Sequence, residues 1–199
     1  MQRDTIPYVV ETYGEVTSTF DVLRQRRDEP EGLVIVAEAQ TAGIGQRGRT
    51  FFSPPGTGIY VGILLKPTAT DANVVLDETM VTRMTARAVC RAIEVIVPGA
   101  EPTIKLPNDV LVDGRKVCGI LAQGLPATPE HDACLIVGIG VNVYEPCGGF
   151  PPEIADKAGA LFSRAAPIPA STASDITLDD TQSDVRMRLV NTILDEFAS

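Results

Sequence analysis

The segment AEAQTAGIGQRGRTFFSPPGTGIYVGILL, residues 37–65, places a loop rich in glycine and arginine between two apolar runs. Three glycines and two arginines fall within residues 43–49. Apolar residues precede this loop at 33–37 and follow it at 59–65. The pattern predicts a loop held between two strands, in which glycines let backbone N–H groups approach an anion and arginines supply positive charge. We therefore expect a ligand that carries phosphate or carboxylate.

The composition fits one globular domain, residues 1–199, with 44% hydrophobic and 22% charged residues. The formal charge of −9 argues against general binding to nucleic acid or membrane, since both partners are anionic. The alternative for the basic loop is a set of solvated surface arginines. The N-terminus lacks the pattern of a signal peptide, and the apolar runs are shorter than the roughly 20 residues of a bilayer span.

The cysteines and the histidine argue against several chemistries. Cys90, Cys118, Cys134 and Cys147 contain no CxxC pair, and His131 stands in a polar stretch. This spacing predicts neither a structural zinc nor a disulfide framework. Nothing near His131 supports nucleophilic catalysis. We expect reduced, mostly buried cysteines and a cytoplasmic protein.

Hydrophobic periodicity outlines the elements. It predicts strands at residues 7–10, 33–38, 58–65, 103–105, 110–112, 116–122 and 134–143, and helices at 77–97, 152–162 and 179–198. A further short helix carries Val22 and Leu23 after the hydroxyl caps Thr17, Ser18 and Thr19. Residues 165–177 are expected to form a loop, and Asp113-Gly114 a hairpin turn.

Two helices carry an apolar residue at every fourth position. These series are Met80, Met84, Ala88, Ala92 and Ile96 in the first helix, and Val185, Leu189, Ile193 and Phe197 in the last. Strands and helices do not alternate regularly along the chain. We therefore predict an α+β fold, with a mixed, largely antiparallel sheet and helices packed on it.

The loop also matches the pattern GxGxxG from Gly43 to Gly48. In dinucleotide-binding proteins a helix begins inside this pattern, and its N-terminus meets the pyrophosphate. Here the pattern leads into RTFFSPPG, whose aromatic residues and Pro-Pro pair cannot open a stable helix. This observation disfavours a dinucleotide site.

A different interpretation covers residues 14–145. The blocks are residues 40–51, SPPGTGIYVGILL, KLPND (105–109), GRKVCGILAQ (114–123) and VGIGVNV (137–143), with Ser18-Thr19 upstream. In order and spacing they resemble biotin protein ligase. The resemblance implies the class II aminoacyl-tRNA-synthetase-like fold of that catalytic domain. It also implies two steps: biotin and ATP give biotinyl-5′-AMP and pyrophosphate, and a lysine of a carrier domain then takes the biotin.

The resemblance assigns roles to individual residues. Lys116 and Arg49 are the catalytic candidates, because such a reaction needs positioning and compensation of negative charge. Asp109 is expected beside Mg²⁺, which takes hard oxygen ligands. The residues expected to bind biotin or ATP are Ser18, Thr19, Phe20, Gln40, Gly43, Ile44, Gly45, Gln46, Arg47, Phe51, Lys105, Asn108, Asp109, Gly119, Gly140 and Asn142. From the residues alone, Ser18 and Thr19 remain explicable as helix caps, Asn108-Asp109 as a turn, and Lys116 as a surface lysine.

The chain departs from the family at four positions. Ile44 and Gln46 stand where the loop usually has arginines, Phe51 replaces a tryptophan, and Leu106 replaces the tryptophan of the usual KWPND. Gln46 removes a charge that helps to retain the adenylate. We also expect neither an N-terminal DNA-binding domain nor a C-terminal β-domain.

The expected partner is the biotin carboxyl carrier domain of a biotin-dependent carboxylase, with no nucleic acid or membrane partner and with a homodimer as one option for assembly. Two alternatives stay open. The first is a ligase-like protein that binds biotin or its adenylate with little turnover. The second is a lipoyl or octanoyl transferase of the related fold.

Overall fold

The computed structural model describes residues 7–66, 77–163 and 180–198. Its strands are β1 (Val9–Val16), β2 (Leu33–Gln40), β3 (Gly58–Leu65), β4 (Thr103–Lys105), β5 (Asp109–Val112), β6 (Arg115–Leu125) and β7 (Cys134–Asn142). Its α-helices are α1 (Thr19–Gln25), α2 (Glu78–Ile96) and α3 (Asp180–Ala198), and a short 3₁₀ turn, η1, covers Gln46–Gly48. The loop expected at residues 165–177 lies outside the described residues.

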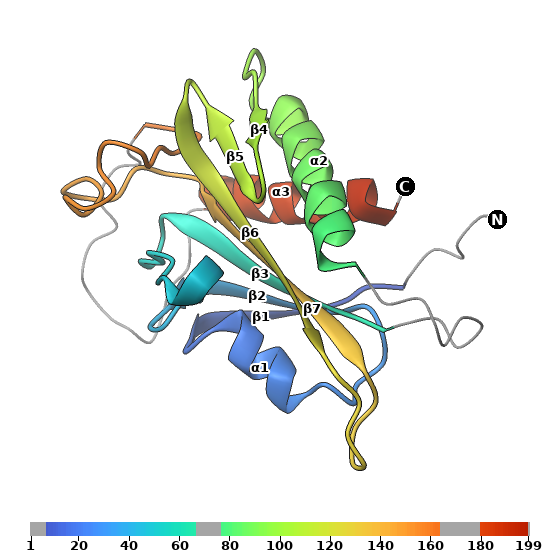
Figure 1. The fold of residues 1–199 in the computed structure, drawn as a ribbon. Helices are drawn as coiled ribbons and strands as arrows, with labels where there is room; N and C mark the ends of the chain where they lie inside the picture. Colours follow the sequence, from blue (N-terminus) through green and yellow to red (C-terminus); the bar gives the residue numbers. More distant parts are fainter. Residues whose placement is uncertain (1–6, 67–76, 164–179, 199) are drawn as a thin grey trace.

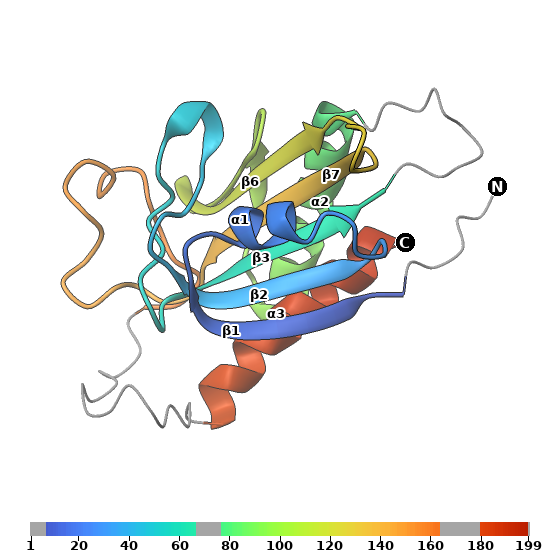
Figure 2. The ribbon, with the colours of Figure 1, turned by 90° about the horizontal axis from the view of Figure 1, so that it is seen from below.

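Within the described residues, the strands form a seven-stranded sheet in the order β1-β2-β3-β7-β6-β5-β4. β1 and β2 run parallel, and all other neighbouring strands are antiparallel. α1 covers one face of the sheet, and α2 and α3 cover the other (Figures 1 and 2). The predicted α+β fold, with helices packed on a mixed, largely antiparallel sheet, is confirmed.

The central strands are buried because helices cover both faces of the sheet. Every residue of β3 is buried, as expected for a strand that packs on both sides. The larger apolar cluster lies between the sheet and the α2–α3 layer. A smaller cluster under α1 contains Phe20, Leu23, Ile35, Leu64 and Ile136. The start of α1 follows the predicted capping, since Ser18 Oγ accepts a hydrogen bond from Phe20 N at 3.2 Å.

The expected apolar stripe on α2 is wrong in its first half. Met80 and Met84 are 53% and 41% exposed, whereas Val81, Val89 and Ile93 are buried. A helix with 3.6 residues per turn rotates by about 40° over each fourth residue, so a strict series of this spacing drifts around the helix. The series predicted for α3 is confirmed, because Leu189 and Ile193 are buried and Val185 and Phe197 pack, partly buried, against the same core.

The predicted helix at residues 152–162 is also wrong, because this segment forms turns and short bridges. Its backbone pairs with β6: Lys116 N donates to Lys157 O at 2.7 Å, and Gly159 N donates to Lys116 O at 2.8 Å. These tertiary hydrogen bonds take backbone groups that a continuous helix would use internally, and they hold the segment against the start of β6.

The first strand is longer than the predicted residues 7–10 and covers Val9–Val16. Its sequence VVETYGEV has little apolar alternation, because this edge strand is largely exposed. The strand is specified by its partner, since β1 pairs with β2 from Val9 opposite Leu33 to Val16 opposite Gln40. Local periodicity cannot reveal such a strand.

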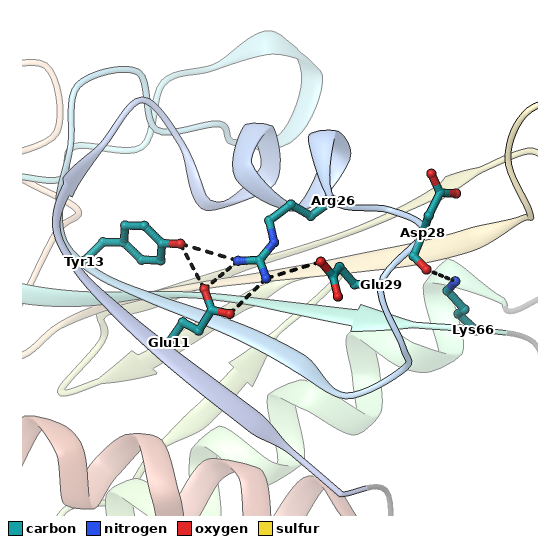
Figure 3. Close-up of polar contacts among 6 residues, drawn as sticks. All are labelled: Glu11, Tyr13, Arg26, Asp28, Glu29 and Lys66. Carbon is teal, nitrogen blue, oxygen red and sulfur yellow. Dashed lines mark hydrogen bonds and ion pairs between the residues drawn. The ribbon is translucent and has the colours of Figure 1, made fainter.

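A polar cluster ties the end of α1 to β1 (Figure 3). The Arg26 guanidinium makes two hydrogen bonds to the Glu11 carboxylate, with the Nη2–Oε1 distance at 2.9 Å. Tyr13 Oη donates to Glu11 Oε2 at 3.0 Å, and Glu29 Oε1 lies 3.5 Å from Arg26 Nη2. The hydrogen bonds from Arg26 and Tyr13 lower the pKa of Glu11 below its ordinary value.

We expect Glu11→Gln to lower the melting temperature at pH 7, because it removes the charge-assisted pair with Arg26. The lowered pKa makes this contribution complete above the unfolded value of about 4.3, and it disappears as the pH falls through the folded value. The difference between wild type and variant should therefore shrink on acidification. Glu15→Gln, which changes an exposed carboxylate of the same strand, is the matched control, and an equal effect of both variants would contradict the pairing.

Two further expectations concern the cysteines and the membrane. Cys118 and Cys134 are buried, and Cys90 is half-buried, as expected for core thiols. Burial raises the pKa of Cys118, which keeps this group a neutral thiol. Among the helices within the described residues, none has both the length and the apolar character that crossing a membrane requires.

Candidate active site

A pocket of about 50 Å³ opens on the face of the sheet that α1 covers. Five separate segments converge on it: the start of α1, the end of β2, the glycine-rich loop, the β4–β5 turn and the paired strands β6 and β7. The lining residues are Thr19, Phe20, Gln40, Ile44, Gly45, Gln46, Phe51, Asn108, Lys116, Gly119, Ile120, Leu121, Gly138, Ile139 and Gly140. The pocket therefore unites four of the five sequence blocks with Thr19 upstream, whereas residues 53–65 contribute none of its lining.

One side of the pocket carries neutral polar groups. Thr19 N donates to Gln40 Oε1 at 2.9 Å, and Gln40 Nε2 donates to Ser53 Oγ at 3.0 Å. Ser53 Oγ in turn donates to Phe51 O at 2.9 Å. This chain of hydrogen bonds fixes the start of α1, the end of β2 and the loop relative to one another. Amide and hydroxyl groups in such a frame suit a ligand that both donates and accepts hydrogen bonds.

The opposite side carries a charged pair. Lys116 Nζ lies 2.7 Å from Asp109 Oδ1 and 5.7 Å from the centre of the Phe51 ring. Both charged side chains are partly exposed, at 33% for Lys116 and 24% for Asp109. The Lys116 backbone is bonded on its other side to the 152–162 segment, so the lysine stem starts from a fixed point. This geometry places a cation where it can meet an anionic ligand.

A tight hairpin turn brings Lys116 and Asp109 together. Asp113 and Gly114 have φ angles of 50° and 73°, in the left-handed region that an Asp-Gly turn uses. The pairing of β5 with β6 shifts in register between Val110 and Leu111. Such an irregularity re-aims side chains near a site, and the predicted Asp-Gly hairpin is confirmed.

Glycines form the floor of the pocket, and two aromatic rings lie on them. Gly119 and Gly140 are direct partners across β6 and β7. A Cβ added to Gly140 would lie 2.5 Å from Phe51 Cε1, and one added to Gly119 would lie 2.9 Å from Phe51 Cε2. At Gly138 an added Cβ would lie 2.3 Å from Phe20 Cε2. Only glycine leaves room for these rings against the sheet.

The glycine-rich loop is closed by its own backbone. Gly45 N donates to Arg49 O at 2.7 Å, and Phe51 N donates to Gly43 O at 2.9 Å. Arg47 has a φ angle of 57°, and the only helical element here is the three-residue turn η1. A dinucleotide site would need an α-helix at this point. The absence of one among the described loop residues 43–51 agrees with the sequence argument.

Several predicted site residues do not line the pocket. Arg47, Arg49 and Lys105 are exposed, and none of them contributes to the lining. Ser18 caps α1, Gly43 is buried at the start of the glycine-rich loop, and Asp109 forms an ion pair with Lys116. Asn142 Nδ2 donates to Gly159 O at 2.9 Å, a contact that holds the 152–162 segment.

Four lining residues were not predicted: Ile120, Leu121, Gly138 and Ile139. Gly138 had a readable signal, because Gly138 and Gly140 are two residues apart on one strand and face the same side of the sheet. The position of the other three depends on the register between β6 and β7, which pairs Ile120 with Ile139 and Leu121 with Gly138.

A second cavity, of about 220 Å³, lies between the sheet and α3. Its lining includes Val36, Ile59, Met187 and the buried Arg186, whose Nη2 lies 3.9 Å from Glu38 Oε1. This cavity is larger, but it contains none of the residues predicted for the site. We assign the site to the smaller pocket because polar groups from five segments converge there.

The fold and this pocket define an α+β protein whose sheet carries a small pocket over Gly119, Gly138 and Gly140. The sequence model of the Biotin/lipoate A/B protein ligase family matches residues 13–142. The chain belongs to this family. That match covers the strands and loops that build the pocket.

Individual relatives agree with this membership. The chain is 38% identical over 137 residues to "Bifunctional ligase/repressor BirA" of Bacillus subtilis. This match covers 68% of this chain and 40% of the relative. It is 30% identical over 146 residues to "Biotin--[acetyl-CoA-carboxylase] ligase" of Mycobacterium tuberculosis, covering 70% and 48%. The chain thus spans less than half the length of these relatives.

A solved structure extends the likeness to the whole fold. The structure titled "Biotin protein ligase from Aquifex aeolicus in complex with biotin and ATP" has a TM-score of 0.67 and 28% sequence identity. The comparison covers 94% of this chain and 69% of the Aquifex chain. The predicted resemblance to the biotin protein ligase catalytic domain is confirmed.

Proposed function

We propose that this chain joins biotin to AMP at the expense of ATP and then transfers biotin to a lysine of a carrier domain. One observation carries the proposal. Lys116 Nζ, held by Asp109 at 2.7 Å, stands at one end of a glycine-floored pocket whose other end presents Thr19 and Gln40. Biotin has a carboxylate at one end and a ureido ring at the other, so its polar groups match both ends of the pocket.

In the first step a biotin carboxylate oxygen attacks the α-phosphorus of ATP, and the bond to pyrophosphate breaks. Lys116 compensates the negative charge on the carboxylate and the phosphate, and Arg49 is the second cation proposed for this step. In the second step a carrier lysine amine attacks the acyl carbon, loses a proton and expels AMP. Neither step needs a nucleophile from the chain, which agrees with the lack of support for His131 as a catalytic base.

Mg²⁺ would arrive with ATP. Among the described residues, no group of three or more His, Cys, Asp or Glu side chains could hold a metal ion. A single carboxylate together with substrate phosphates suits Mg²⁺, which keeps several waters. Asp109 is the acidic residue beside the charged end of the pocket and is our candidate ligand. Asn108 Nδ2 donates to Ile120 O at 3.0 Å and so holds the neighbouring turn in place.

The partner of the proposed enzyme is a biotin carrier domain of a carboxylase. The name of the Mycobacterium relative, a biotin–acetyl-CoA-carboxylase ligase, supports this choice. A cytoplasmic location, a homodimer and the organisation of residues 1–199 as one catalytic domain stay predictions of the sequence.

The direct test mixes the chain with biotin, Mg-ATP and a carrier domain. We expect biotinylated carrier and biotin-dependent exchange of pyrophosphate into ATP. Tight biotin binding in a calorimeter with no exchange would instead favour a binding protein with little turnover. Transfer of lipoate or octanoate in place of biotin would favour the transferase alternative.

Gln46 lines the pocket, at a loop position where the resemblance to biotin protein ligase implies an arginine. We expect Gln46→Arg to slow the release of biotinyl-5′-AMP, because a charge-assisted hydrogen bond contributes about 1.5–3 kcal/mol. That energy corresponds to a factor of about 10–140 in the release rate. A chase of labelled adenylate measures this rate, with Gln46→Met as the uncharged control. Equal release from both variants would refute a role for charge at this position.

A further inference from the structure

We propose that Phe20, seated on Gly138, forms the inner wall of the pocket and sets the size of the ring system that the pocket accepts. The inference rests on the proposed function, because it assumes that the carboxylate of the substrate lies at Lys116. It assigns to Phe20 and Gly138 a role in substrate discrimination, in addition to their place in the fold.

The Phe20 ring is held firmly. It lies in the first turn of α1, is 2% exposed, and packs in the cluster that includes Leu23, Ile35 and Ile136. Its backbone N is fixed by the Ser18 cap. Phe51 differs, because it is half-buried and follows the largely exposed glycine-rich loop. Of the two rings in the pocket, Phe20 is therefore the fixed one.

Gly138 gives the Phe20 ring its seat. A Cβ at position 138 would lie 2.3 Å from Phe20 Cε2 and 3.0 Å from Cδ2, so a single methyl group would displace the ring. Gly62 is the partner of Gly138 across β3 and β7. A Cβ added to Gly62 would likewise clash with Leu23 and Thr19, which lie on the same helix as Phe20. The close approach of α1 to the sheet therefore explains the two glycines structurally. It does not explain why Phe20 and Gly138 also line the pocket.

The positions along β7 place this wall at the far end from the lysine. Lys116 Cε and Nζ lie 3.1 Å from the Cβ position of Gly119, which pairs with Gly140. Gly138 is two residues further along β7, a distance of about 6.6 Å at the rise of a strand. A substrate whose carboxylate meets Lys116 thus points its other end toward Phe20. For biotin, that end is the bicyclic ring.

The test uses substitutions that move the wall in opposite directions. Phe20→Leu shortens the side chain and draws the wall back, whereas Gly138→Ala pushes the ring into the pocket. The probes are biotin, desthiobiotin, which lacks the sulfur-containing ring, and biotin sulfone, which carries two more oxygens. One methylene in an apolar pocket changes kcat/KM by about 10–200-fold, so shifts of tenfold or more between probes are expected.

We expect Phe20→Leu to shift the preference toward biotin sulfone and Gly138→Ala to shift it toward desthiobiotin. The double variant should return near the wild-type preference, because the two changes in volume offset each other. The KM for ATP should stay constant in all three. Gly14→Ala, which adds a methyl group where no atom lies within 4 Å, is the matched control and should leave the preference unchanged.

The outcomes distinguish a failure of the role given to Phe20 from a failure of the proposed function. If the wild-type chain turns over biotin and all variants show the same preference among the three probes, the role of Phe20 in substrate discrimination is wrong but the proposed function stands. Equal losses of kcat/KM for all three probes and for ATP would also contradict this role. Such losses would indicate damage to the fold, which melting curves would show. No turnover of biotin by the wild-type chain would contradict both the proposed function and the role of Phe20.

Discussion

Replacing Lys116 with alanine should reduce the formation of biotinyl-5′-AMP by about 10²–10³-fold, the usual cost of losing a donor that acts in the transition state. The lysine amine stands at the charged end of the pocket, and no other cation contributes to the lining residues that the structure describes. Its side chain is 33% exposed, so the loss of packing is small and the melting temperature should change by only a few degrees. Biotin-dependent exchange of labelled pyrophosphate into ATP measures the effect.

Lys157→Ala is the matched control for this prediction. The Lys157 side chain is 76% exposed, lies outside the pocket and makes only a 3.8 Å ion pair with Asp156. We expect its exchange rate to equal that of the wild type. A Lys116→Ala variant that unfolds at a much lower temperature but keeps its exchange activity would assign the lysine to structure alone.

Asp109→Asn should slow adenylate formation by about 10–100-fold, the cost expected when a group that orients a ligand or metal is lost. The substitution preserves the shape of the side chain but removes the charge that holds Lys116 Nζ at 2.7 Å. Because Asp109 is also the proposed Mg²⁺ ligand, the half-saturating Mg²⁺ concentration should rise. Rates measured over a Mg²⁺ titration would separate these two contributions.

Asp156→Asn serves as the control for Asp109→Asn, because Asp156 is 70% exposed and lies outside the pocket. If the only effect of Asp109 were charge repulsion of the anionic substrate, Asp109→Asn would speed the reaction. A faster rate, or an unchanged rate and Mg²⁺ requirement, would thus contradict both roles that we give to Asp109.

The sequence predicted the elements whose patterns are set locally. The buried runs of β3 and β7, the Asp113-Gly114 turn and the Ser18 cap carry their signal within a few residues. The resemblance to biotin protein ligase also predicted most of the segments that meet at the pocket, although residues 53–65 do not line it. Neither kind of signal predicted the full length of β1, whose polar sequence forms a strand because β2 lies beside it.

The remaining errors have the same origin in tertiary contacts. The segment 152–162 has a sequence compatible with a helix, but its backbone groups bond to Lys116. At the site, the structure brings Thr19, Gln40, Lys116 and the glycines of β6 and β7 together and leaves Arg49 exposed outside the lining. The seat of Phe20 on Gly138 depends on how closely α1 approaches the sheet, and no sequence pattern gives that distance.

The central claim is that Lys116 and the glycine-floored pocket join an acid to AMP. Mass spectrometry of the chain after incubation with biotin and Mg-ATP tests it most directly. We predict biotinyl-5′-AMP in the mixture from the wild-type chain and, at the same short incubation time, about 10²–10³-fold less from Lys116→Ala. Biotin and ATP recovered unchanged from a folded wild-type chain would contradict the account.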